Sequence, residues 1–167
     1  KDEFIKPNTS LEGLAKLKPV FKKDGSVTAG NASGLNDGAA AILLMSDLGL
    51  KQNNTKPLTR IVASAIAGVE PRIMGIGPVK ASQKALQRAG LTLDQIDIIE
   101  INEAFAAQVL SCLTALNIAF DDPRVNANGG AIALGHPLGM SGARLLQTAS
   151  LELHRQQLQN MFPLETS

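Results

Sequence analysis

Apolar positions along this chain follow two different periods. Three stretches carry apolar residues at helical intervals, and they cover residues 78–89, 103–116 and 141–154. Three others are short apolar runs of strand length, and they cover residues 39–45, 60–67 and 96–101. The unbroken run 39–45 is typical of a strand that is buried on both faces. Because strands and helices alternate, we expect a layered α/β fold with a mixed or mostly parallel sheet.

Helix start and stop signals add detail to this pattern. Thr9 and Glu12 have the spacing of a capping box and are followed by leucines at helical intervals, which predicts a short helix near the N-terminus. Ser46 is placed to cap a second short helix. Gly90 directly follows the helix predicted over 78–89, which has a proline in its first turn. Between these elements the polar residues 51–57 indicate a domain boundary.

Composition excludes several classes of function. The 167 residues carry a formal net charge of +1 and include neither Trp nor Tyr, so neither nucleic acid nor an anionic membrane is an expected partner. The single cysteine excludes an internal disulfide and fits a reducing compartment. No apolar run approaches the length of a membrane span, and the first four residues do not look like a signal peptide. We therefore expect a cytoplasmic protein.

Residues 126–144 are the most informative stretch. They hold five of the fifteen glycines and one of the two histidines. His136 lies between Gly135 and Pro137, directly before a predicted helix, and the N-terminus of a helix is rich in unpaired donors. This arrangement is typical of a side chain presented by a rigid turn, and His136 is our candidate base. The alternative is a tight loop with an incidental histidine.

Asn102 lies where the strand predicted over 96–101 gives way to a helix, which is a usual location of sites in open α/β sheets. Its amide can hold a water or a carbonyl oxygen. Asn is also a preferred helix N-cap, and its position alone favours that role. By contrast, Cys112 lies on an apolar helix and is predicted to pack in the core, and His154 is predicted to be a solvated surface residue. No zinc motif is present, and we expect no metal.

Four segments together resemble the thiolases, which are acetyl-CoA C-acyltransferases. The motifs are Asn102–Gln108 (NEAFAAQ), the glycine-rich residues 126–144, residues 27–45 (VTAGNASGLNDGAAAILLM) and residues 70–78 (EPRIMGIGP). The chain looks most like the degradative members that act on β-ketoadipyl-CoA or acetoacetyl-CoA, in fatty acid or aromatic degradation. The resemblance covers about residues 8–154. It implies a thiolase-like α/β fold in which residues 1–55 are the end of the N-terminal half, with a CoA-contacting loop and its last strand, and residues 56–167 are a truncated C-terminal domain.

The resemblance also implies roles for individual residues. His136 matches the histidine that deprotonates a catalytic cysteine and then lines the first oxyanion hole, and Asn102 matches the asparagine that holds the catalytic water of that hole. Other positions match residues that contact CoA (Leu17, Ala29 and Ser33) or form the wall of the acyl pocket (Met74, Ala104 and Phe105). Coenzyme A is then a substrate, no further cofactor is implied, and the family assembles as dimers or tetramers, so we expect a homo-oligomer.

The chain departs from the family at both catalytic cysteines. The nucleophilic cysteine belongs to the part of the family that precedes Lys1, and the second lies on strands that should follow Arg155. Residues 156–167 contain neither cysteine nor glycine, and we expect no strand pair there. The parent activity would be cleavage of 3-ketoacyl-CoA with CoA, or condensation of two acetyl-CoA, but the isolated chain is predicted to be inactive. The alternatives are a non-catalytic CoA- or partner-binding module and an inert truncation product.

Overall fold

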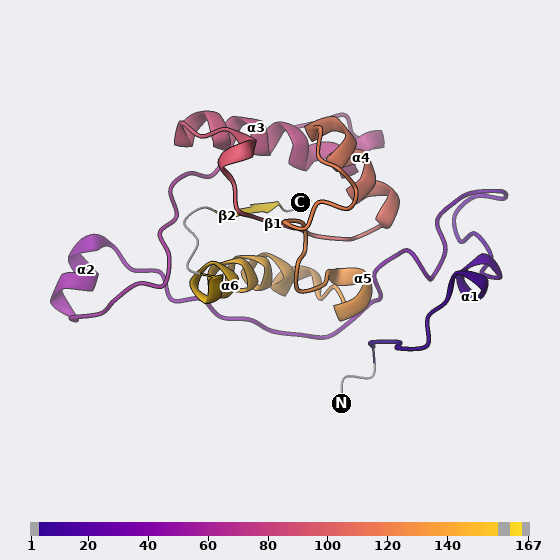
Figure 1. The fold of residues 1–167 in the computed structure, drawn as a ribbon, viewed down its shortest axis with the longest axis horizontal. Coiled ribbons are helices and arrows are strands. Elements are labelled where there is room, and N and C mark those ends of the chain that lie inside the picture. Colours follow the sequence, from indigo (N-terminus) through magenta and orange to yellow (C-terminus); the bar gives the residue numbers. More distant parts are fainter. Residues whose placement is uncertain (1–3, 157–160, 165–167) are drawn as a thin grey trace.

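The computed structural model describes residues 4–156 and 161–164, and it has three layers. The central layer is a two-stranded parallel sheet of β1 (Ile98–Ile101) and β2 (Met161–Leu164), in which Ile98 is paired with Met161. One face is covered by α3 (Gly77–Ala89) and α4 (Ala106–Leu116), and the other by α5 (Ala131–Leu134) and α6 (Leu138–Gln156) (Figure 1). The remaining elements are short: α1 (Leu11–Ala15), α2 (Asp47–Gln52) and the 3-10 turns η1 (Pro71–Ile76) and η2 (Leu93–Gln95).

Strand β1 is buried on both sides and divides the core in two. Side chains of successive strand residues point to opposite faces. Ile99 and Ile101 accordingly pack into a cluster that includes residues of α3 and α4, whereas Ile98 packs against Ala149 and Leu153 of α6. Glu100 lies on the α6 side as well, next to Arg144. The predicted layered α/β fold is confirmed, with this one strand at the centre of the described chain.

Several predicted helix boundaries are confirmed. The side chain of Ser46 accepts a hydrogen bond from the backbone of Gly49 at the start of α2, and Gly90 ends α3 in the left-handed conformation, which glycine adopts without a Cβ penalty. Near the N-terminus Ser10 is the N-cap of α1, rather than Thr9. Helix α4 begins at Ala106, three residues later than predicted, and its N-cap Phe105 has an extended backbone.

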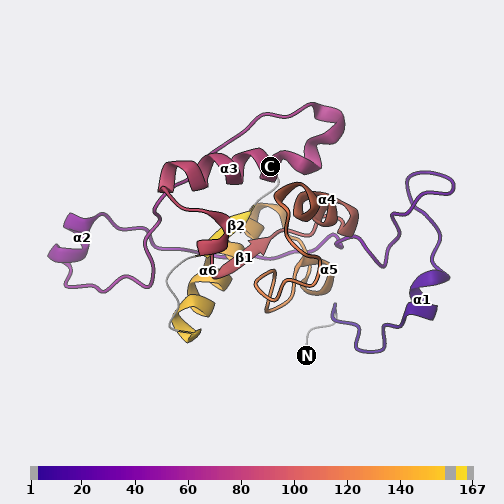
Figure 2. The ribbon, with the colours of Figure 1, turned by 45° about the horizontal axis from the view of Figure 1, so that its top comes forward.

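The strands predicted over 39–45 and 60–67 are wrong for the described part of the chain. Neither run is a strand in the structure, and both expose large apolar side chains, with Leu43 79%, Leu44 70% and Ile66 84% exposed. The second run makes polar contacts with α3, such as the bond that Arg88 donates to the carbonyl of Ser64. In Figures 1 and 2 both runs belong to long coil segments that lie outside the three layers. An apolar run becomes a buried strand only where strands pair with it, and no described strand does.

We expected no pair of strands in residues 156–167, and the described part of this tail supplies a single strand. Residues 161–164 form β2, which pairs in parallel with β1 along its whole length. This strand contains Pro163, which sequence rules place only at the edges of sheets. An edge is where β2 lies, because β1 is its single partner in the described sheet.

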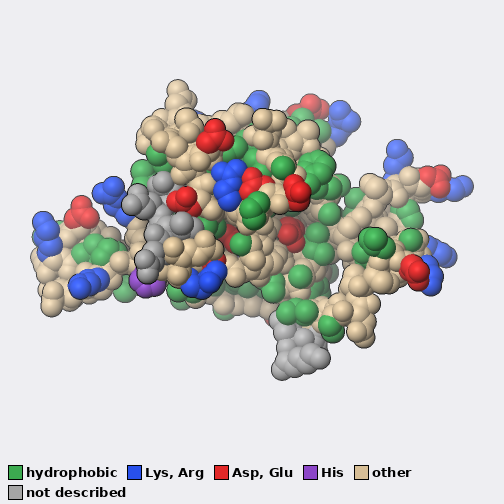
Figure 3. Space-filling model, viewed as in Figure 1, with side chains coloured by type: hydrophobic (Ala, Val, Ile, Leu, Met, Phe, Trp, Pro, Cys, Tyr) green, Lys and Arg blue, Asp and Glu red, His purple; other side chains and the backbone are tan. Residues whose placement is uncertain are grey.

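Charged side chains are interspersed over the surface. Figure 3 shows acidic and basic groups mixed on one face, as expected from a net charge of +1. Within the described residues, no helix combines the length and the apolar character needed to cross a bilayer.

Candidate functional site

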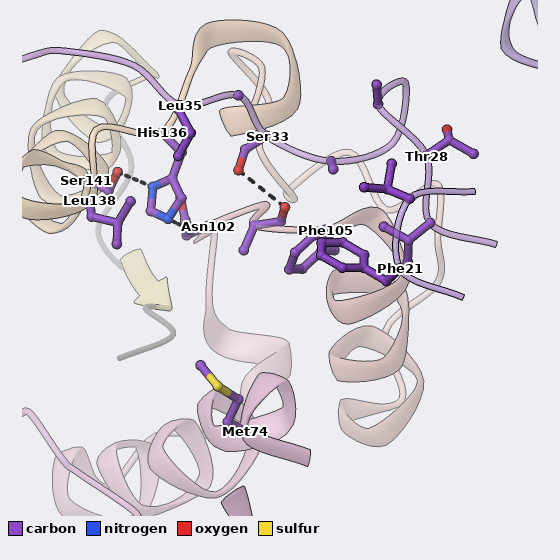
Figure 4. A pocket seen from close by; sticks show the side chains of 16 residues that line it. Phe21, Thr28, Ser33, Leu35, Met74, Asn102, Phe105, His136, Leu138 and Ser141 are labelled. Atoms are coloured by element: carbon purple, nitrogen blue, oxygen red, sulfur yellow. Dashed lines mark hydrogen bonds between the residues drawn. The ribbon is translucent and has the colours of Figure 1, made fainter. Parts of the chain in front are cut away.

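A pocket of about 830 Å³ opens where four segments meet. These are the coil of residues 20–35, the turn η1, the junction between β1 and α4, and the glycine-rich loop before α6 (Figure 4). Seven of the eight residues predicted as site residues line it: Ala29, Ser33, Met74, Asn102, Ala104, Phe105 and His136. Leu17 does not. It is 40% exposed and lies beside Gly30, behind the pocket wall.

His136 is held at both ring nitrogens. Its Nε2 lies 3.2 Å from Nδ2 of Asn102, and its Nδ1 lies 2.6 Å from Oγ of Ser141. An amide nitrogen can only donate, so Nε2 accepts and the imidazole proton is on Nδ1. Oγ of Ser141 accepts the hydrogen bond from Nδ1, and its own hydroxyl donates to the carbonyl of Pro137 at 3.1 Å. In this arrangement the Nε2 lone pair of His136 faces Asn102 on the pocket wall. No sequence signal points to Ser141 except its place at the start of a predicted helix.

Asn102 is a site residue by position and is not a helix cap. It is 2% exposed at the carboxyl end of β1, and the N-cap of α4 is Phe105. Its Nδ2 is directed to His136, whereas its Oδ1 has no hydrogen-bond partner among the described residues. A buried amide oxygen normally has a partner, so this atom has unused capacity for a ligand group.

The small residues of the first coil dock on the start of α4. Asn31 organises this coil, because its side chain accepts from the backbone of Thr28 and donates to the carbonyl of Ser26, both at 2.8 Å. Ser33 donates from both its backbone nitrogen and its hydroxyl to the carbonyl of Ala104. The backbone of residues 29–34 therefore forms one wall of the pocket, where side chains are too small to block a ligand.

Asn36, which is not among the predicted site residues, holds the backbone of His136. Its Oδ1 accepts from the backbone nitrogen of His136 at 3.1 Å, across 100 residues of sequence. It also lies against Gly135, whose φ of +101° belongs to a region that glycine alone adopts readily. No local pattern could have paired residues so far apart in the chain.

Glu100 is a buried acid two residues before Asn102. Its side chain is fully buried, and Nη1 of Arg144 donates to its Oε2 at 3.3 Å. Burial is the main cause that raises the pKa of Glu100 to about 7, partly opposed by the charge of Arg144 and assisted by the charges of Glu103 and Glu152. Within the described chain, Oε1 of Glu100 and Nη2 of Arg144 have no hydrogen-bond partner, so the pair is only partly satisfied.

Cys112 lies outside the site, as predicted. It is fully buried in the core cluster, and its thiol donates to the carbonyl of Gly75 at 3.3 Å. Burial raises the pKa of this thiol, which makes it a poor nucleophile. His154 is exposed on α6, as predicted. In the part of the chain that the structure describes, no group of His, Cys, Asp or Glu could hold a metal ion.

Comparison with known proteins gives consistent matches along the chain. The family model described as "Thiolase, C-terminal domain" matches residues 55–162, and "Thiolase, N-terminal domain" matches residues 1–47. The β-ketoadipyl-CoA thiolase of Acinetobacter baylyi is 60% identical over 154 residues, and the 3-oxoadipyl-CoA/3-oxo-5,6-dehydrosuberyl-CoA thiolase of Escherichia coli is 58% identical over the same length. Each match covers 92% of this chain and 38% of the relative, so the chain spans about two fifths of their length.

Solved structures give matches of the same kind. The acetyl-CoA acetyltransferase of Bacillus anthracis superposes with a TM-score of 0.90 at 50% identity, covering 95% of this chain and 40% of that one. Human mitochondrial 3-ketoacyl-CoA thiolase in complex with CoA also gives a TM-score of 0.90, at 52% identity, covering 93% of this chain and 39% of that one.

Proposed function

The chain belongs to the thiolase family, and from this premise we propose that its pocket is half of an acyl-transfer site for CoA thioesters. The reaction is cleavage of a 3-ketoacyl-CoA by CoA, giving acetyl-CoA and a shortened acyl-CoA, or the reverse condensation. Free CoA is consumed in the cleavage and released in the condensation, and the other reactants in both directions are CoA thioesters. The names of the Acinetobacter baylyi and Escherichia coli relatives, at 60% and 58% identity, support a 3-oxoadipyl (β-ketoadipyl) thioester as the substrate, whereas a relative from Chromobacterium violaceum that is also 58% identical is named acetyl-CoA acetyltransferase.

One observation carries the proposal. The Nε2 lone pair of His136 and the amide of Asn102 meet 3.2 Å apart on the pocket wall, where they can act on the same reacting group. An imidazole whose Nε2 carries a lone pair is the form required of a general base. A thiol near neutral pH needs such a base, since the thiolate is the competent nucleophile.

We assign the steps accordingly. Nε2 of His136 takes the proton of a cysteine thiol, and the thiolate attacks the 3-keto carbon of the substrate. The bond between C2 and C3 then breaks, the acyl group stays on the cysteine, and the acetyl-CoA carbanion takes a proton from the second catalytic cysteine of the family, which recovers one from the thiol of the incoming CoA. CoA thiolate next attacks the acyl-cysteine and releases the shortened acyl-CoA. Asn102 and protonated His136 stabilise a developing oxyanion, an interaction typically worth about 3 kcal/mol for each donor.

The nucleophilic cysteine must come from outside these 167 residues. Cys112 is the one cysteine of the sequence, and it is buried in the core away from His136. We therefore propose that the isolated chain has no thiolase turnover. The same observation supports a second candidate, a thiolase-derived module that binds CoA or a partner without catalysis.

Coenzyme A binding tests the pocket directly. Ala29 lines the pocket and is exposed, so a larger side chain there narrows the pocket without disturbing the core. We expect CoA to bind the chain in isothermal titration calorimetry, and Ala29→Leu to weaken binding at least tenfold, which corresponds to about 1.4 kcal/mol.

The matched control is Ala115→Leu, an exposed alanine on α4 that does not line the pocket. This variant should bind CoA as tightly as the parent chain. Equal affinities for both variants would place CoA elsewhere on the surface. No binding by any of the three chains would favour an inert product over either candidate function.

A further inference from the structure

We infer that Glu103 and Asn126 are positioning residues, which together fix the strand that carries Asn102 to the loop that carries His136. The role of Glu103 and Asn126 in catalysis rests on the proposed function. The contacts themselves belong to the described chain and can be tested without any ligand.

The side chain of Asn126 is hydrogen-bonded to the backbone of the residue before Asn102. Its Oδ1 accepts from the backbone nitrogen of Ile101 at 2.8 Å, and its Nδ2 donates to the carbonyl of the same residue at 2.9 Å. Residues 124–126 run alongside β1, since Ile99 bonds to the carbonyl of Arg124 and to the nitrogen of Asn126. The backbone of residues 124–126 pairs with Ile99, and the side-chain amide of Asn126 extends this pairing to Ile101, the residue before Asn102.

Glu103 directly follows Asn102, and its carboxylate is hydrogen-bonded to Asn126 and to the loop that leads to His136. Its Oε1 accepts the second N–H of Asn126 at 2.8 Å, and its Oε2 accepts from the backbone nitrogen of Ile132 at 3.0 Å. The carboxylate occupies the space where a Cβ of residue 130 would be, so Gly130 is required for this approach. Both oxygens have N–H donors, and such charge-assisted bonds are about twice as strong as neutral ones.

The two residues connect the halves of the site through a short path. Asn102 lies between Ile101 and Glu103, both of which the contacts hold. Ile132 belongs to the four-residue helix α5, which leads through Gly135 directly to His136. Asn36 and Ser141 also hold His136, but neither contacts the backbone on either side of Asn102 through a hydrogen bond shown here. The Glu103–Asn126 contacts therefore set the separation of the Asn102 amide from Nε2.

The chain has two histidines, so nuclear magnetic resonance can test whether Glu103 and Asn126 position His136 against Asn102. In the 15N-labelled, ligand-free chain, the Nε2 resonance of His136 reports the bond from Asn102, and exposed His154 is an internal reference. Glu103→Gln keeps the shape but replaces one acceptor oxygen with an NH2 group. We expect it to shift the His136 Nε2 and Asn102 Nδ2 signals and to leave His154 unchanged.

Asn126→Asp is the second variant, because it removes both N–H donors and puts a second carboxylate beside Glu103. It should shift the same two signals. The control Glu12→Gln alters an exposed carboxylate on α1 and should shift neither. Parent-like His136 signals in the folded variants, or global unfolding of both, would overturn the inference. Because no CoA is present, this result is independent of whether the proposed function holds.

Discussion

Gly135→Ala is expected to destabilise the chain by about 3 kcal/mol and to displace His136. The φ of +101° at this position costs a residue with a Cβ on the order of 1–3 kcal/mol. The added methyl would also lie only 2.8 Å from the side chain of Asn36. To escape this clash, Asn36 must give up the hydrogen bond that it accepts from the backbone of His136.

Gly139→Ala is the matched control for this substitution. It lies four residues later in the first turn of α6, where a Cβ would meet no atom within 4 Å. Alanine is a better helix former than glycine, so this variant should be as stable as the parent or up to about 1 kcal/mol more stable. Urea unfolding followed by circular dichroism measures both. Equal stability of the two variants, with unshifted His136 resonances, would contradict the described loop geometry.

Arg144→Met is expected to destabilise the chain by about 3–5 kcal/mol at pH 8, which is the usual cost of removing one member of a buried ion pair. Arg144 is the basic partner that lowers the pKa of Glu100 against the effect of burial. Without it the carboxylate is buried beside two further acids, Glu103 and Glu152. The measurement is the free energy of unfolding in urea at pH 5 and pH 8.

The dependence on pH has a definite sign. The pKa of Glu100 is about 7 in the folded chain and close to its ordinary value of 4.5 when unfolded. Between these values the folded chain binds more protons, so stability is highest at the acidic end and falls as the pH rises through the window. For Glu100 alone the parent loses on the order of 3 kcal/mol. Arg144→Met should steepen this loss, and Glu100→Gln should remove it.

The exposed ion pair of Glu70 and Arg72 provides the control. These two groups are 3.6 Å apart, and 63% and 84% of their side chains are exposed. Exposed pairs contribute at most about 1 kcal/mol, so Arg72→Met should change stability little at either pH. If Arg144→Met is no worse than Arg72→Met at pH 8, Glu100 is not the buried, perturbed acid described here.

Local signals in the sequence predicted local features well. Gly90 and Ser46 mark helix ends because their effects depend on the neighbouring backbone alone. The turn that presents His136 was predicted for the same reason, since Gly135 and Pro137 restrict the backbone on either side of it.

Features that depend on distant contacts could not be predicted in this way. The run 39–45 is apolar enough for a buried strand, but burial requires neighbouring strands that the described chain does not supply. Asn102 has the properties of a helix cap until His136, 34 residues away, is placed beside it. Asn36 and Glu100 acquire their importance from partners 100 and 44 residues distant. For Asn102, resemblance to a family supplied an expected role that periodicity could not.

The central claim is that this chain carries the His136–Asn102 half of a thiolase site. The most direct measurement places its 154 matching residues in the Acinetobacter baylyi relative, in exchange for the corresponding residues, and follows thiolysis of β-ketoadipyl-CoA. We expect the folded chimera to be active and the isolated chain to show no turnover. In the chimera, His136→Ala should lower kcat at least about a hundredfold, and His154→Ala should have no effect. A folded but inactive chimera, or equal activity of the two histidine variants, would contradict the claim.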